Sequence, residues 1–165
     1  MTSEHLLHTI PPIYDGNSKI LILGSFPSVK SREVSFYYGH PQNRFWRVLA
    51  AVLGCAVPSS NEEKTALLQS HNIALWDVIK SCDIVGSSDS SIKNVVPNDI
   101  GVILSSCGIR QIYSNGKTSE KLFNKYIKDT VGRDTVALPS TSPANALYNL
   151  ERLTDSWSVI KNNIR

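Results

Sequence analysis

The segment between Lys19 and Trp46 carries the residues of this chain that are best suited to chemistry. It contains the turn Gly-Ser-Phe-Pro-Ser at 24–28, an aromatic pair at 37–38 and the run His-Pro-Gln-Asn at 40–43. Backbone N–H groups and hydroxyls in such a turn can bind phosphate oxygens, and aromatic rings can stack on bases. Amide and imidazole groups add hydrogen-bond donors and acceptors. The segment therefore predicts a pocket for a flat, polar ligand derived from a nucleic acid.

These residues need a scaffold, and the apolar pattern of the chain predicts one in which strands alternate with helices. The predicted strands are Ile20–Gly24, Ile73–Ile79, Ile109–Ser114 and Thr135–Leu138. The predicted helices are Arg44–Leu53, Asn61–His71 with Asn61 as its N-cap, Pro97–Ser106, Ser119–Lys128, and Ala144–Ile164 in one or two pieces. This alternation predicts one α/β domain over residues 1–165, a three-layer α/β/α sandwich around a four-stranded, mainly parallel sheet.

Open parallel sheets bind their ligands beyond the carboxyl ends of the strands. In this chain those ends are 24–28, 77–81, 115–117 and 139–145, and all of them are rich in Gly, Ser, Asn or Pro. Every α/β protein has such residues in these turns. The turns GSFPS and PSTSP, however, also place serine beside proline and can direct hydroxyl and N–H groups at phosphate. The pattern favours a polar cleft at this edge of the sheet.

The composition is that of a soluble globular protein, with 165 residues of which 41% are hydrophobic and 19% charged. The three cysteines are widely spaced and form no CxxC pair, so we expect neither a metal site nor a cofactor. No apolar run approaches the ~20 residues of a membrane span, and the start MTSEHLLHTIPP lacks the features of a signal peptide. We therefore expect a cytoplasmic monomer without membrane contact. Its net charge of +3 permits a polyanionic partner but does not require one.

Three blocks of the sequence resemble a known family. GSFPSVKS followed by FYYGHPQNRFW resembles the first motif of the uracil-DNA glycosylase superfamily, in particular its mismatch-specific uracil enzymes. ALWDVIKSC with GSSDSSI, and then LPSTSPAN, resemble the hypoxanthine-DNA (deoxyinosine) glycosylase branch. The resemblance spans Ile20 to about Asn149. It implies a monofunctional DNA glycosylase of base excision repair that hydrolyses the N-glycosidic bond of a flipped, deaminated base in DNA, without a metal or cofactor. Hypoxanthine is the expected base, with uracil or xanthine as further candidates.

The chain departs from the mismatch-specific uracil enzymes just before the proline of the first motif. Those enzymes carry an asparagine there that positions the attacking water, whereas this chain has Phe26, whose ring can neither orient water nor accept a proton. The resemblance to the deoxyinosine branch implies that Asn43 has the main catalytic role, holding a water or hydrogen-bonding the base. His40 is its expected helper, through proton transfer or charge stabilisation. An asparagine at this place can also serve only as a helix cap, and His40 can simply shape the turn.

The expected bases set the hydrogen-bonding groups that the pocket must offer. Hypoxanthine and uracil present an N–H donor beside a carbonyl, so their site needs an acceptor beside a donor. Asp77 can accept but not donate while ionised, and it can equally cap the next turn; Asn115 can do both. The resemblance places Tyr38 in a stack on the flipped base, and Phe26 is expected on the pocket wall. Further aromatic residues are expected in the core, namely Tyr37, Phe45 and Trp46.

The resemblance also implies a set of contacts to the DNA backbone. The residues expected to make them are Ser28, Lys30, Ser31, Ser140, Ser142 and Asn145. In the second motif of the superfamily, a residue is pushed into the space left by the flipped nucleotide. This position falls on Pro143 or Ala144, neither of which is the usual bulky wedge.

Two alternatives to a glycosylase remain at this point. One is a DNA- or nucleotide-binding module that keeps the cleft but has lost catalysis, which the presence of Phe26 makes conceivable. The other is a serine-dependent hydrolase that uses Ser25 or Ser140 with His40. The chain has no GxSxG elbow, which counts against the hydrolase.

Overall fold

A four-stranded parallel sheet forms the centre of the computed structural model, which describes residues 2–165. Its strand order is β3-β2-β6-β7, with β2 at Ile20–Gly24, β3 at Ile73–Asp77, β6 at Gln111–Asn115 and β7 at Thr135–Leu138. All five residues of β2 are buried because both faces of this strand are covered. The prediction of a central, four-stranded parallel sheet is confirmed.

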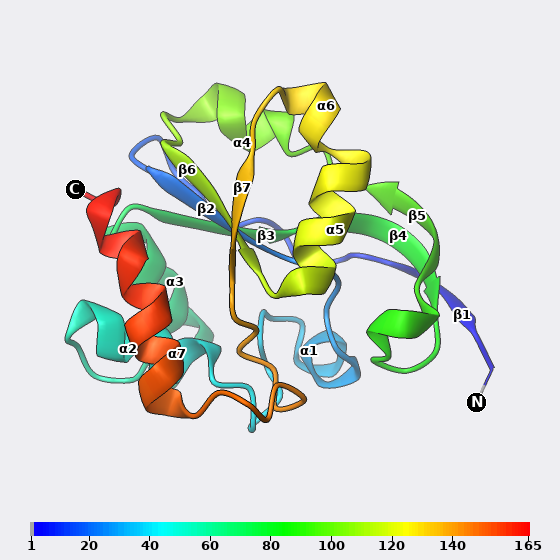
Figure 1. Ribbon diagram of the computed structural model, residues 1–165, viewed down its shortest axis with the longest axis horizontal. Helices are drawn as coiled ribbons and strands as arrows, with labels where there is room; N and C mark the ends of the chain where they lie inside the picture. The colour runs from blue at the N-terminus through cyan, green and yellow to red at the C-terminus, as the bar shows by residue number, and fades with distance from the viewer. Residues whose placement is uncertain (1) are drawn as a thin grey trace.

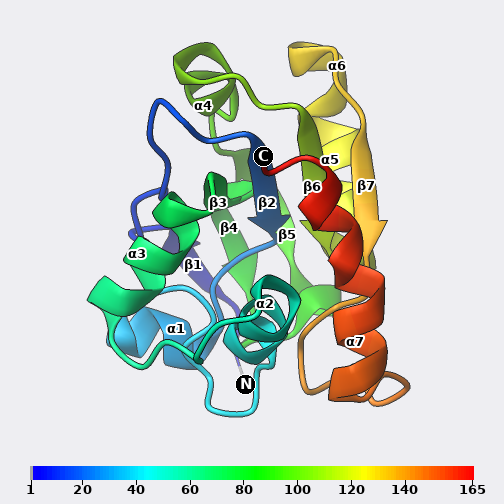
Figure 2. The same cartoon turned by 90° about the vertical axis from the view of Figure 1, so that its left-hand side faces the viewer.

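Helices cover both faces of this sheet (Figures 1 and 2). One layer contains α2 (Phe45–Leu53), α3 (Asn61–Ser70) and α7 (Leu150–Trp157), and the other contains α4 (Gly101–Ser106) and α5 (Lys117–Tyr126). Alternate residues of β2 divide between the two cores, so that Ile20 and Ile22 pack with the first layer and Leu21 and Leu23 with the second. The predicted three-layer arrangement is therefore correct.

A second, antiparallel sheet was not predicted. It joins β1 (Glu4–Leu7), β4 (Ile79–Ile84) and β5 (Lys93–Pro97) in the order β1-β4-β5. The predicted strand 73–79 is wrong at its end, because the chain leaves the parallel sheet at Val78 and begins β4 at once. The Asn98 side chain stabilises this change of sheet, since its Nδ2 donates to the carbonyl oxygens of Asp77 (2.9 Å) and Ile79 (3.1 Å). As a result, the N-terminal segment lies beside the end of β3.

Several helix boundaries also differ from the predictions. Helix α3 has Ser60 rather than Asn61 as its N-cap, because the Ser60 hydroxyl accepts from the Glu63 N–H at 3.0 Å. The C-terminal helix begins at Leu150, where Asn149 caps it, so 144–149 is a loop. Helix α4 begins after Pro97 because 93–97 pairs with β4. The remaining short helices are α1 (Val29–Val34), η1 (Asp89–Ser91), α6 (Lys128–Val131) and η2 (Ser158–Asn162).

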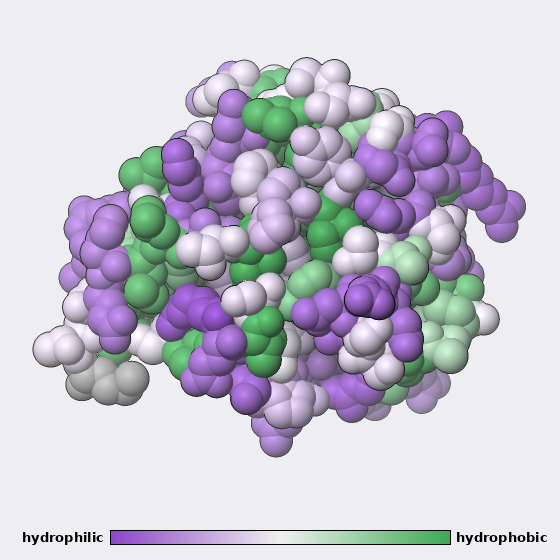
Figure 3. Space-filling model, turned by 180° about the vertical axis from the view of Figure 1, so that it is seen from behind, coloured by the Kyte–Doolittle hydropathy of each residue, from purple (hydrophilic) through white to green (hydrophobic). Residues whose placement is uncertain are grey.

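The surface mixes residue types on the side turned away from the viewer in Figure 1. On that side, hydrophilic and hydrophobic residues are interspersed (Figure 3). Among residues 2–165, none of the helices has the length and apolar character needed to cross a membrane. The expected core aromatics Tyr37, Phe45 and Trp46 are buried.

Candidate functional site

A cavity of about 390 Å³ opens at the carboxyl ends of the parallel strands. This volume lies within the usual range for small-molecule sites. The structure brings most of the predicted site residues to its lining: Phe26, Ser28, Ser31, Tyr38, Asn43, Asp77, Asn115, Ser140 and Ser142. They come from turns that are far apart in sequence and meet because all the strands of the sheet point the same way.

One side of the cavity is formed by Asn43, Thr141 and Asn115, which we call the amide wall. Asn43 Oδ1 accepts from the backbone N–H of Phe45 (3.0 Å) and from the hydroxyl of Thr141 (2.9 Å). The Thr141 hydroxyl in turn accepts from Asn115 Nδ2 at 3.0 Å. Both bonds to Asn43 occupy its oxygen, and within the described part of the chain its Nδ2 has no hydrogen-bond partner. The wall therefore offers N–H donors to the cavity.

Thr141 is the residue of the wall that sequence reasoning missed. It is fully buried, and its backbone N–H donates to Asn115 Oδ1 at 3.1 Å while its carbonyl accepts from the Arg44 N–H at 3.0 Å. These bonds occupy the oxygen and one N–H of Asn115, so that Asn115 supports the wall as well as lining the cavity. The only sequence signal was the place of Thr141 between Ser140 and Ser142 in a turn.

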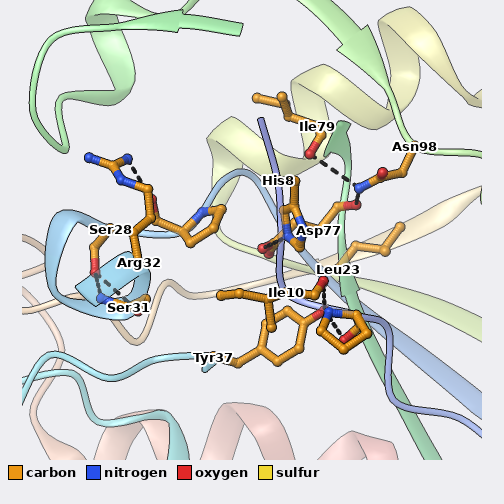
Figure 4. A network of polar contacts seen from close by, with 12 residues as sticks. His8, Ile10, Leu23, Ser28, Ser31, Arg32, Tyr37, Asp77, Ile79 and Asn98 are labelled. Carbon is orange, nitrogen blue, oxygen red and sulfur yellow. Dashed lines mark hydrogen bonds and ion pairs between the residues drawn. The ribbon is translucent and has the colours of Figure 1, made fainter. Parts of the chain in front are cut away.

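The carboxylate floor consists of Gly24, Tyr38, Asp77 and His8. Asp77 is only 4% exposed, and its Oδ2 lies 2.8 Å from His8 Nε2, whose side chain is also buried (Figure 4). A Cβ atom on Gly24 would lie 2.4 Å from Asp77 Oδ1 and 2.9 Å from the Tyr38 hydroxyl oxygen. Only glycine leaves room for these two oxygens, so the end of β2 is part of the floor.

His8 was also missed from the sequence. It follows β1, whose pairing with β4 carries it to the end of β3. Its ring packs edge-on against Phe26, with 6.0 Å between the ring centroids. Phe26 itself lines the cavity and packs against the apolar residues of β4. Phe26 thus contacts both the cavity and the His8 ring.

Tyr38 packs against a core aromatic residue, and its stacking on a flipped base stays a prediction. Its ring stacks on Phe45, with 4.1 Å between centroids and 21° between planes. Its hydroxyl is buried and has no hydrogen-bond partner in the described residues. Burial, and then the nearby Asp77 charge, raises the pKa of Tyr38 above its ordinary range, and the neighbouring Asn115 side chain offsets only part of this rise. The phenol therefore stays neutral and keeps a proton to donate.

Three of the predicted site residues do not line the cavity. His40 Nδ1 accepts from the Gln42 N–H at 3.1 Å, so this imidazole shapes its own turn. The ammonium of Lys30 lies 3.6 Å from a Glu33 carboxylate oxygen on exposed α1. Lys117, at the start of α5, reaches the cavity instead. The third residue, Asn145, acts within its own loop.

That loop, residues 139–149, is tied to the start of α2, and we call it the clamped loop. The Arg44 guanidinium donates through Nη2 to the carbonyl oxygens of Ser142 (2.9 Å) and Asn145 (3.0 Å), and through Nη1 to that of Tyr148. Asn145 Nδ2 donates to the Ser140 carbonyl at 3.0 Å. The loop is therefore held by hydrogen bonds from its own Asn145 side chain and from Arg44, which lies outside it.

The serines predicted to contact the DNA backbone form two pairs in the cavity lining, Ser140 with Ser142 and Ser28 with Ser31. Ser140 Oγ accepts from the Ser142 N–H (3.1 Å) and Ser142 Oγ from the Ala144 N–H (3.2 Å), which leaves both hydroxyl hydrogens free to donate to an anion. Ser28 Oγ accepts from the Ser31 N–H and donates to Ser31 Oγ at 3.1 Å. The second pair is thus more fully engaged within the protein than the first.

The arrangement does not support a serine hydrolase. No hydrogen bond joins His40 to Ser25 or Ser140 in residues 2–165, and His40 lies outside the cavity lining. In the same part of the chain, no three His, Cys, Asp or Glu side chains are grouped as metal ligands would be. The described cysteines are all free thiols.

Comparison with known proteins agrees with the motifs. Residues 11–162 match the Uracil DNA glycosylase superfamily. A hypoxanthine DNA glycosylase of Methanosarcina barkeri is 36% identical over 150 residues, which cover 90% of this chain and 93% of that protein. One of Methanosarcina acetivorans is 34% identical over 152 residues, covering 91% and 94%.

A solution NMR structure of a protein from Methanosarcina acetivorans, described as a candidate uracil DNA glycosylase, has the same fold. It superimposes with a TM-score of 0.79 at 33% identity, over 92% of this chain and 94% of that one. Sequence, cavity and fold thus agree, and the chain belongs to the uracil DNA glycosylase superfamily.

Proposed function

We propose that this protein is a monofunctional DNA glycosylase of base excision repair that removes deaminated bases from DNA, hypoxanthine above all, with uracil and xanthine as further substrates. The single observation that carries the proposal is the unpartnered Nδ2 of Asn43 at the cavity, held in place by the amide wall. The two Methanosarcina relatives are hypoxanthine DNA glycosylases, which favours hypoxanthine as the base.

The geometry of Asn43 distinguishes between the two roles open to its amide. Its oxygen already accepts two hydrogen bonds, so it is poorly placed to accept a proton from water. An N–H donor withdraws electron density from a water molecule but stabilises a departing base that gains negative charge. We therefore assign the Asn43 amide to the leaving base. Water then attacks a sugar with oxocarbenium character, which needs little activation and no covalent nucleophile.

The direction of the wall supports this role. Asn115 donates to Thr141, and Thr141 donates to Asn43, so the chain of hydrogen bonds ends at the Asn43 oxygen. Bonds aligned in this way polarise one another and make the last N–H a better donor. The wall also fixes the amide before the substrate arrives, which is the arrangement that electrostatic catalysis requires.

The clamped loop and the start of α5 supply candidates for DNA contacts. Ser140, Ser142 and Lys117 line the cavity and can bind phosphate oxygens. Leu147 is 81% exposed on the clamped loop, where Arg152 Nη1 donates to its carbonyl at 2.7 Å. An exposed apolar side chain on a loop whose backbone is held in this way suits insertion between base pairs. Leu147 therefore replaces Pro143 and Ala144 as our candidate wedge.

The proposal is tested by incubating the protein with duplex and single-stranded oligonucleotides that contain one hypoxanthine, uracil or xanthine, followed by alkaline cleavage of abasic sites. We expect cleavage only after alkali, and fastest for hypoxanthine. Strand cleavage without alkali would contradict a monofunctional enzyme. No cleavage with any substrate, but retained affinity for the oligonucleotides, would favour the inactive binding module.

A further inference from the structure

The carboxylate floor holds two oxygens that the proposed reaction does not yet use. Asp77 Oδ1 and the Tyr38 hydroxyl converge above Gly24, where a Cβ atom would collide with both. Both residues line the cavity. A base that enters the cavity therefore meets an oxygen pair whose hydrogen-bonding character decides which base fits.

Asp77 is held so that it can act only as an acceptor there. His8 Nε2 donates to Oδ2 at 2.8 Å, and the two side chains are 2% and 5% exposed. Asn98 holds the backbone carbonyl of the same residue at 2.9 Å (Figure 4). With Oδ2 engaged, Oδ1 is the carboxylate oxygen left for the cavity, because no hydrogen bond to it occurs within residues 2–165.

Tyr38 supplies a hydrogen-bond donor beside this acceptor. Its hydroxyl is buried without a partner in the described residues, and burial raises the pKa of the phenol, so that it remains a neutral donor. A buried donor without a partner is destabilising, and native proteins keep few of them. The stack on Phe45 fixes the ring, and the backbone of Tyr38 has a positive φ of 52°. Such strained or unsatisfied positions are common where a ligand completes the site.

We propose that Tyr38 and Asp77 together read the Watson–Crick edge of the flipped base, with the Tyr38 hydroxyl donating to its carbonyl and Asp77 Oδ1 accepting from its ring N–H. This inference rests on the proposed function. It selects bases with an N–H beside a carbonyl, namely hypoxanthine, uracil and xanthine. Adenine and cytosine present a ring acceptor beside an amino donor, so each contact would place like against like. Guanine also presents an N–H beside a carbonyl, so this oxygen pair does not exclude it. Guanine is excluded because flipping it requires the opening of an intact base pair, which costs more free energy.

His8 is the positioning residue of this pair. It touches no substrate, but it decides which carboxylate oxygen faces the cavity. Phe26 lines the cavity and packs against the His8 ring. Phe26, which stands where related enzymes have an asparagine, therefore contributes to base recognition through its packing on His8.

The experiment removes one oxygen atom from the protein, through Tyr38→Phe, and one from the base, by replacing hypoxanthine with unsubstituted purine. Duplexes carrying one hypoxanthine or one unsubstituted purine, which lacks the carbonyl and the ring N–H at this edge, are compared under single-turnover conditions with wild-type protein and Tyr38→Phe. We expect Tyr38→Phe to lower the hypoxanthine rate roughly 10- to 100-fold and to leave the purine rate unchanged. Its melting temperature should be unchanged or higher, because an unpartnered hydroxyl is lost.

The matched control is Tyr113→Phe, which removes a buried hydroxyl outside the site that accepts from Asn163 Nδ2. It should leave the ratio of the two rates unchanged. Equal losses of both rates in Tyr38→Phe, or no loss of either, would overturn the inference while leaving the glycosylase intact.

A second measurement separates the inference from the proposed function. If the wild-type protein releases no base at all, the binding of free hypoxanthine and free purine is followed by NMR shifts of the cavity residues. Preferential binding of hypoxanthine that is lost in Tyr38→Phe would support the base-reading pair even in an inactive protein. Equal binding of the two bases by the wild-type protein would refute it.

Discussion

The amide wall and the carboxylate floor face the same cavity but differ in charge and in the kind of group they present. The wall is neutral, and its side-chain bonds run from Asn115 through the Thr141 hydroxyl to the Asn43 oxygen, which leaves N–H donors for the cavity. The floor contains a buried carboxylate with one oxygen engaged by His8, next to a hydroxyl without a partner. A donor that meets any departing base serves the rate of the reaction, whereas an acceptor and a donor side by side serve the choice of base. The two regions should therefore respond differently to substitution.

The largest effect is expected from Asn43→Asp in the wall. Aspartate keeps an oxygen for the Phe45 N–H and the Thr141 hydroxyl, but it replaces the free NH₂ group with an acceptor. We expect kcat to fall by about 10²–10³ for every accepted base, as for the loss of one preorganised donor, with little change in the melting temperature. Single-turnover rates and thermal melts measure both quantities.

This variant also tests the cap alternative for Asn43. An asparagine that serves only as a cap would tolerate aspartate, since both residues are good N-caps. Retained activity in Asn43→Asp would therefore show that the amide wall has no role in catalysis. A loss for hypoxanthine but not for uracil would instead move Asn43 into base selection and erase the distinction between wall and floor.

A smaller and more selective effect is expected from His8→Ala in the floor. Without the imidazole, the Asp77 carboxylate can turn, so kcat/KM for hypoxanthine relative to unsubstituted purine should fall about tenfold. Because this variant leaves a buried charge without its partner, part of the protein can be unfolded. The ratio of the two kcat/KM values does not depend on the amount of active enzyme and is therefore the quantity to measure.

His8→Gln provides the matched comparison for this variant. A glutamine can donate a hydrogen bond through its side-chain amide, so it should restore most of the base preference. If His8→Ala keeps the wild-type ratio, the histidine only fills space. An equal loss of rate with both bases would show that His8, like the amide wall, affects the rate of the reaction and not the choice of base.

The smallest effect is expected outside both regions, at Leu147 on the clamped loop. Leu147→Ala should lower activity on duplex DNA by a few-fold, up to about tenfold, because less apolar surface enters the base stack. Activity on single-stranded DNA and the ratio between bases should stay the same. Equal losses on the two kinds of DNA would show that this leucine does not act as a wedge.

The wall and the floor also differ in how far the sequence predicted them. β2 and β7 have the predicted bounds, because a short apolar run followed by a turn is a local pattern. The cavity residues at the strand ends followed from the parallel topology. His8 and Thr141 did not, because each acquires its partner through the fold: His8 lies 69 positions from Asp77 and Thr141 lies 98 positions from Asn43.

The second sheet was missed for a related physical reason. The burial of β4 is interrupted by exposed Lys80, and its pairing with β5 shows shifts of register. The three strands stabilise one another only after the chain has folded back. His40 is the opposite case, since its residue type suits catalysis, yet its hydrogen bond with Gln42 keeps it within its own turn.

Arg44, the residue next to Asn43, connects the clamped loop to the start of α2, and this bears on how the protein meets DNA. Its guanidinium is bonded to the carbonyls of Ser142, Asn145 and Tyr148 before any nucleic acid is present. Ordering a loop costs conformational entropy, and here that cost falls on folding rather than on association. The loop proposed to meet the phosphates and the amide proposed to meet the base are thus already placed relative to one another. On the proposed function, the protein docks on DNA as a preformed shape, and the main conformational change is that of the nucleotide that leaves the helix.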